Sequence, residues 1–185
     1  NVMFDTVSRA MSMGVCGHTP WGKLDKVKFL CPVPGYDRHF AICEHFGIEM
    51  IPVELGEDGP DVAEVARLVA DPAVKGIWCV PQYSNPCGYT YSDEVVRGLA
   101  ALEPAASDFR IFWDNAYAVH HLYDDPTLQD HVLNIIDACA EAGHPDMVFE
   151  FCSTSKVTFP GAGISAFVSS VANVNEMLAS MGAQT

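Results

Sequence analysis

The sequence of 185 residues has few basic side chains. It contains 10 Lys and Arg against 24 Asp and Glu, which gives a formal net charge of −14. Proteins that bind nucleic acid or anionic membranes need a basic face, so this balance argues against both partners. No apolar run reaches the ~18 residues of a membrane span. We therefore expect a globular protein with no nucleic-acid partner and no membrane partner.

Paired cysteines are also lacking. The chain has seven cysteines, and no two of them form C-x-x-C or lie at zinc-finger spacing from a histidine. Several lie in apolar runs such as Trp78-Cys79-Val80, where cysteine behaves as a small buried apolar residue. This usage is typical of a reducing compartment, and we expect a cytoplasmic protein.

Three other chemistries find little support. A dinucleotide site would need G-x-G-x-x-G after the first strand, and the sequence has none there. Ser155-Lys156 could be a hydrolase pair, but no oxyanion-hole motif accompanies it. His120 and His121 stand near two aspartates, yet adjacent histidines on an extended segment point apart, so we expect no metal site.

Apolar segments of helical and strand character alternate along the chain, which predicts a largely parallel sheet in a three-layer α/β/α fold. Ligands in such folds bind beyond the carboxyl ends of the strands. We expect Pro32 to end the first strand, Pro60 to open a helix and Ser92 to cap another. The expected strands are 26–31, 48–53, 76–80, 109–113, 147–151 and 164–169, and the expected helices include 3–15, 36–46, 128–142 and a last one to about 181.

Three polar loops follow predicted strand ends. They contain Asn85-Pro86-Cys87-Gly88, then Asp114 and Tyr117, then Ser153-Thr154-Ser155-Lys156. Each has a plain structural interpretation, because Asn-Pro-x-Gly favours turns, Asp and Ser cap helices, and lysine is often a solvated surface residue. These interpretations do not explain why all three loops stand at the carboxyl ends of strands.

The ordered set N-P-x-G, D-x-x-Y and S-x-S-K resembles the fold-type I pyridoxal-phosphate aminotransferases of classes I and II. The stretches CPVPGYDRHF, IWCVPQYSNPCG, IFWDNAY and STSKVTFPGAG are similar to the MocR-like branch, which includes bacterial aspartate aminotransferases. The resemblance covers nearly the whole chain. It implies the large, cofactor-binding domain of such an enzyme.

The resemblance also implies roles for individual residues. Lys156 would form the Schiff base with pyridoxal 5′-phosphate and move protons, for which a desolvated lysine is suited. Asp114 would hold the proton of the pyridine nitrogen, so that the ring can act as an electron sink. Tyr117 and Asn85 would hydrogen-bond the ring O3′. The remaining cofactor-binding residues implied are Ser153 and Ser155 for the phosphate and Tyr36, which either stacks on the ring or is a core aromatic.

The sequence departs from the family pattern in some places. Many relatives have a phosphate-binding arginine eight residues after the lysine, where this chain has Ile164. The phosphate loop of relatives would precede Asn1, and the small domain with its substrate-binding arginine would follow Thr185. We therefore expect residues 1–185 to be the central part of the large domain, incomplete at both ends.

The parent protein is expected to be a homodimeric transferase that moves an amino group between an amino acid, aspartate first, and a 2-oxo acid such as 2-oxoglutarate. The first alternative is the aminotransferase-like effector domain of a transcription regulator. The second is a truncated fragment without activity, and we expect the isolated segment to be inactive.

Overall fold

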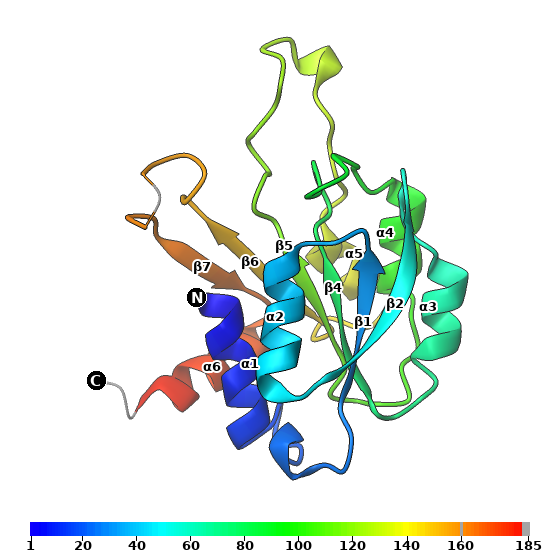
Figure 1. Ribbon diagram of the computed structural model, residues 1–185, viewed down its shortest axis with the longest axis vertical. Helices are drawn as coiled ribbons and strands as arrows, with labels where there is room; N and C mark the ends of the chain where they lie inside the picture. Colours follow the sequence, from blue (N-terminus) through cyan, green and yellow to red (C-terminus); the bar gives the residue numbers. More distant parts are fainter. Residues whose placement is uncertain (160, 183–185) are drawn as a thin grey trace.

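The computed structural model describes residues 1–159 and 161–182. Within them, helices and strands alternate along most of the chain and surround one sheet (Figure 1). The elements are α1 (Val2–Met13), η1 (Trp21–Lys23), β1 (Lys28–Val33), α2 (Asp37–Phe46), β2 (Glu49–Gly56), β3 (Gly59–Pro60), α3 (Val62–Leu68), β4 (Val74–Cys79), α4 (Asp93–Ala100), β5 (Arg110–Asp114), η2 (Pro126–Leu128), α5 (Ile135–Glu141), β6 (Val148–Ser153), β7 (Ser165–Val168) and α6 (Val171–Met181).

The sheet has seven strands in the order β3-β2-β1-β4-β5-β6-β7. The five central strands, β2, β1, β4, β5 and β6, are mutually parallel, whereas β3 and β7 pair antiparallel at the two edges. Helices α1 and α2 pack on one face, and α3, α4 and α5 pack on the other. The predicted three-layer fold with a mainly parallel sheet is confirmed. Among the described residues no helix is long and apolar enough to cross a membrane.

The central strands are buried on both faces because their side chains alternate between two apolar cores. In β5, Ile111 and Trp113 join the core under α3, α4 and α5, while Phe112 joins the core under α1 and α2. Phe112 lies 5.2 Å from Phe29 and 4.8 Å from Trp78, measured between ring centroids. Continuous apolar runs are typical of parallel strands covered on both sides.

The prolines and caps were predicted with mixed success. Pro32 does not end its strand, because β1 continues to Val33. Its pairing with β2 runs to Val33 while its pairing with β4 covers Lys28–Leu30, so a residue without an N–H fits there. Pro60 belongs to β3 rather than to a helix, and Asp61 caps α3 instead. The predicted cap is confirmed, since Ser92 Oγ accepts from the N–H of Val95 at 3.3 Å.

The prediction of a helix over 128–142 is wrong for the first half of that range. Pro126–Leu128 forms a short 3-10 turn, and α5 begins only at Ile135. Asn134 sets this start, because its Oδ1 accepts from the N–H groups of Ile136 and Asp137 at 2.9 and 3.3 Å. The preceding residues form part of the long connection between β5 and α5, residues 115–134, which rises from the sheet (Figure 1) and is called the excursion below.

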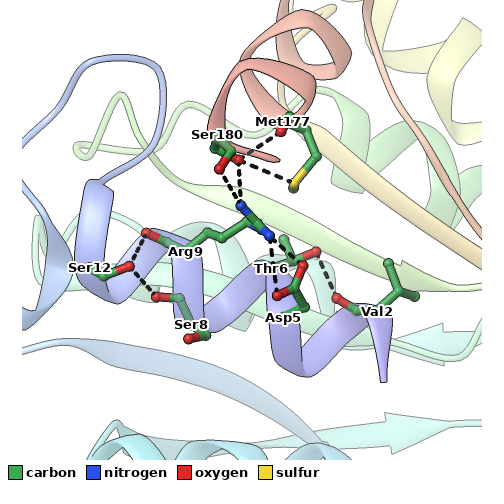
Figure 2. Close-up of polar contacts among 8 residues, drawn as sticks. All are labelled: Val2, Asp5, Thr6, Ser8, Arg9, Ser12, Met177 and Ser180. Atoms are coloured by element: carbon green, nitrogen blue, oxygen red, sulfur yellow. Dashed lines mark hydrogen bonds and ion pairs between the residues drawn. The ribbon is translucent and has the colours of Figure 1, made fainter. Parts of the chain in front are cut away.

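Two polar anchors tie distant parts of the chain together. At the amino-terminal side of the sheet, buried Asp108 accepts from Lys75 Nζ at 2.6 Å and from Trp21 Nε1 at 2.8 Å. Figure 2 shows the second anchor, between α1 and α6, where Arg9 Nη1 donates to the carbonyl and hydroxyl oxygens of Ser180 at 2.7 and 2.9 Å. The second anchor holds α1 against α6.

Candidate active site

The three polar loops meet at the carboxyl-terminal edge of the sheet, where parallel strands bring their ends together. A cavity of about 250 Å³ opens there between the loops and the first turn of α1. Every residue that the sequence pointed to lines this cavity: Tyr36, Asn85, Asp114, Tyr117, Ser153, Ser155 and Lys156. These seven residues come from four separate segments of the chain, since Tyr36 comes from the loop before α2.

Asp114 is the last residue of β5, and only 7% of its surface is exposed. Its Oδ2 lies 2.9 Å from Nε2 of His39, which is itself buried in α2. A buried carboxylate needs such a partner, because an unpaired buried charge is costly. The hydrogen bond fixes the orientation of Asp114 at the cavity wall.

His39 was not among the predicted site residues. Its ring stacks on Trp78, with centroids 4.4 Å apart and planes inclined by 10°, and the ring of Tyr36 meets it edge-on at 5.2 Å. The sequence signal that could have pointed to His39 is its position three residues after Tyr36, which places both residues at the start of α2. Sequence alone gave no hint of the contact with Asp114, 75 positions away.

Lys156 lies in the turn after β6, and its Nζ is 5.9 Å from the centroid of the Tyr117 ring. The desolvation expected for this lysine is not provided by the described residues, because the side chain is exposed. The turn is compact: the N–H of Ser155 donates to Ser153 Oγ at 3.4 Å. A Cβ added to Gly163 would lie 2.8 Å from Ser155 Oγ and 2.9 Å from Ser155 N, so this position requires glycine.

The amino-terminal turn of α1 also faces the cavity, through Asn1, Val2 and Met3. The cavity thus combines a buried carboxylate, an amine, a phenol and hydroxyls, which suits a cofactor with a ring nitrogen and a phosphate.

A second carboxyl group lies beside the site. Asn115 follows Asp114 directly, and its Nδ2 donates to Oε1 of Glu150 in β6 at 2.9 Å. Burial raises the pKa of Glu150, and this hydrogen bond offsets part of that effect. The pair joins the ends of β5 and β6 next to the cavity.

A family model for aspartate amino-transferases matches residues 1–185, the whole chain. The chain belongs to this family. An aspartate aminotransferase of Corynebacterium glutamicum is 49% identical over 174 residues, which cover 94% of this chain and 40% of that protein. The chain therefore spans less than half the length of this aminotransferase relative.

Solved structures agree with this assignment. The crystal structure of an aspartate transaminase from Corynebacterium glutamicum superposes with a TM-score of 0.95 at 47% identity and covers 100% of this chain and 43% of that one. An α-aminoadipate aminotransferase from Thermus thermophilus, at 20% identity and a TM-score of 0.68, shares the fold over 85% of this chain and 39% of that one. A Bacillus subtilis HTH-type transcriptional regulator is 28% identical over 162 residues, 88% of this chain and 33% of the regulator.

Proposed function

We propose that these 185 residues are the central part of the large domain of a pyridoxal 5′-phosphate-dependent aminotransferase. The enzyme would move the amino group of an amino acid, with aspartate as the expected donor, to a 2-oxo acid such as 2-oxoglutarate. One observation carries the proposal: the seven residues named from the sequence motifs line one cavity at the carboxyl edge of the sheet. The aspartate aminotransferase relative at 49% identity supports the choice of donor.

The cofactor, when bound, supplies an electron sink for the reacting Cα of the substrate. Asp114 would hold the proton on the pyridine nitrogen, because a buried carboxylate favours the charged ring, and His39 would keep Asp114 oriented. Tyr117 and Asn85 would hydrogen-bond O3′, and Tyr36 would stack on the ring. These assignments rest on the position of each residue in the cavity wall and on the family motif.

Lys156 would hold the cofactor covalently through its amine. Once the amine of the substrate has displaced it, the freed Lys156 amine would move a proton between the substrate Cα and the cofactor C4′. Its long, exposed side chain can rotate over the ring of Tyr117, where its Nζ already lies. Ser153 and Ser155 would bind the phosphate, because hydroxyls are good donors to an anion.

The assembly and setting of the whole protein follow from the same proposal. We expect a cytoplasmic homodimer, with a second, smaller domain that supplies the arginine for the substrate α-carboxylate. The isolated segment should be inactive, because phosphate and carboxylate ligands are expected outside residues 1–185. Size-exclusion chromatography of the full-length protein and an activity assay of the segment test these two points.

The decisive experiment is a visible absorbance spectrum of the full-length protein with pyridoxal 5′-phosphate, before and after Lys156→Ala. We expect a band of lysine-bound cofactor that disappears in the variant. A band that survives the substitution would refute the role of Lys156. Asp114→Ala should reduce turnover by at least a hundredfold, and a panel of amino donors in single turnover would test the preference for aspartate.

A second function is suggested by the HTH-type regulator relative. In that case the segment would bind the cofactor and an effector but would not turn over. The enzyme is favoured because the aminotransferase relative is 49% identical, against 28% for the regulator. Multiple turnovers by the full-length protein with aspartate and 2-oxoglutarate would exclude a purely regulatory role.

A further inference from the structure

Two loops of the candidate site are joined to each other outside the cavity, through the side chain of Tyr83. Its Oη lies 3.0 Å from Nδ1 of His121 and accepts from the N–H of Asp130 at 3.0 Å. A phenol can both accept from Asp130 and hydrogen-bond His121, and which of Tyr83 Oη and His121 Nδ1 donates depends on the imidazole tautomer. Tyr83 thus bridges from the loop after β4 to both sides of the long excursion between β5 and α5.

Further hydrogen bonds reinforce this bridge. Thr90 Oγ1 donates to Asp130 Oδ2 at 2.8 Å and accepts from the N–H of Tyr83 at 3.3 Å. The buried amide of Gln82 donates to the carbonyl oxygen of Asp130 at 2.9 Å. The excursion extends well beyond the rest of the molecule (Figure 1), so contacts at its base are what can fix its position.

The backbone of Tyr83 adopts an unusual conformation. Its φ is +49°, in the left-handed region that side-chain-bearing residues rarely occupy. Such conformations persist when surrounding interactions hold them, and they are concentrated near functional sites. Tyr83 lies two residues before the cavity residue Asn85. From this position its phenol reaches His121 and Asp130.

The adjacent residues His120 and His121 contact different tyrosines. The His121 ring meets Tyr83 edge-on at 5.9 Å, and the His120 ring meets the cavity residue Tyr117 edge-on at 5.8 Å. Because one peptide unit joins His120 to His121, the ring contact with Tyr117 and the bridge to Tyr83 are adjacent in the chain. This pair, considered above for metal binding, links the bridge to the cavity wall.

We propose that Tyr83 is a positioning residue: by bonding His121 and Asp130, it holds the 117–131 segment so that Tyr117 faces the cofactor-binding cavity. The inference rests on the proposed function, because it assigns Tyr117 to the cofactor. Tyr83 itself would not touch the reacting atoms. Its effect would be exerted on cofactor affinity through the placement of Tyr117.

The test compares Tyr83→Phe with Tyr123→Phe in the full-length protein, since Tyr123 lies on the same excursion with an exposed ring. We expect Tyr83→Phe, freed of cofactor, to show about tenfold faster amide hydrogen exchange across 117–131, because local opening becomes easier. It should also bind pyridoxal 5′-phosphate about tenfold more weakly, while Tyr123→Phe should match wild type in both measurements.

His121 provides the matched partner variants. His121→Ala should reproduce part of the effect of Tyr83→Phe, which also removes the contact with Asp130. The double variant should lose less than the sum of the two single variants, because both of them remove the contact between Tyr83 and His121. His121→Asn, which keeps a polar atom near the Nδ1 position, should restore most of the cofactor affinity.

Wild-type exchange in Tyr83→Phe would overturn the proposal, and so would faster exchange with unchanged cofactor affinity. The exchange measurement needs no cofactor, so its result is separate from the Lys156→Ala spectrum that tests the proposed function.

Discussion

Replacing His39 by Phe in the full-length protein should weaken cofactor binding without unfolding the site. Phe retains an aromatic ring to stack on Trp78, where the centroids are 4.4 Å apart, but it cannot donate to Asp114. A hydrogen bond to a charged acceptor contributes about 1.5–3 kcal/mol. At about 1.4 kcal/mol for each factor of ten, this predicts a rise in Kd for pyridoxal 5′-phosphate of about 10- to 150-fold.

The measurement is a fluorescence or absorbance titration of the cofactor-free protein with pyridoxal 5′-phosphate. His45→Phe is the control, because His45 lies on the same helix and is exposed. His39→Gln should recover part of the affinity, since its amide can donate where the imidazole did. If His39→Phe binds the cofactor within twofold of wild type, the bond to Asp114 does not orient that carboxylate and the argument fails.

Three further substitutions probe the structure around the site. Asp108→Ala should lower the free energy of unfolding by about 3–5 kcal/mol, because it leaves the charge of Lys75 buried without its partner. Gly163→Ala should slow turnover about tenfold or more, because the new Cβ displaces Ser155 from the turn that carries Lys156, the proposed Schiff-base residue. Glu150→Gln should stabilise the protein at neutral pH, because burial raises the pKa of Glu150 and its ionisation therefore opposes folding.

Each of these results can be checked directly. Denaturant unfolding of the full-length protein measures the first, and a loss below 1 kcal/mol for Asp108→Ala would contradict a buried, mutually dependent pair. Steady-state turnover measures the second, and a normal rate in Gly163→Ala would show that the turn tolerates a shift. Thermal unfolding against pH measures the third: the advantage of Glu150→Gln should shrink as the pH falls toward the ordinary glutamate pKa of 4.5, and a constant difference would refute the linkage.

The fold, and the meeting of the seven candidate residues at one cavity, could be predicted because their signals are local. Continuous apolar runs identify the buried strands, and a polar motif directly after a strand lies at its carboxyl edge in a parallel sheet. Asp114 illustrates this, since it ends β5 and was placed from sequence at the same edge as Lys156. Once the strand order is fixed, three motifs in three loops have only one edge at which to meet.

Periodicity failed where apolar residues serve the core without forming a helix. Val132 and Leu133 pack against the core from an irregular segment, and their spacing with Ile136 imitates a helical face. The start of α5 depends instead on Asn134, whose side chain occupies the free N–H groups of the first turn. A cap therefore sets the boundary more reliably than the hydrophobic pattern does.

The residues that hold the motif in place are harder to see than the motif itself. His39 meets Asp114 across 75 positions and Tyr83 meets His121 across 38, and neither pair has a local spacing that would reveal it. Both contacts act on residues that line the cavity or adjoin it, so losing either would leave N-P-x-G, D-x-x-Y and S-x-S-K intact while weakening cofactor binding. Substitutions at 39 and 83 therefore separate two requirements of this site: the groups that would touch the cofactor, and the hydrogen bonds that keep those groups in position.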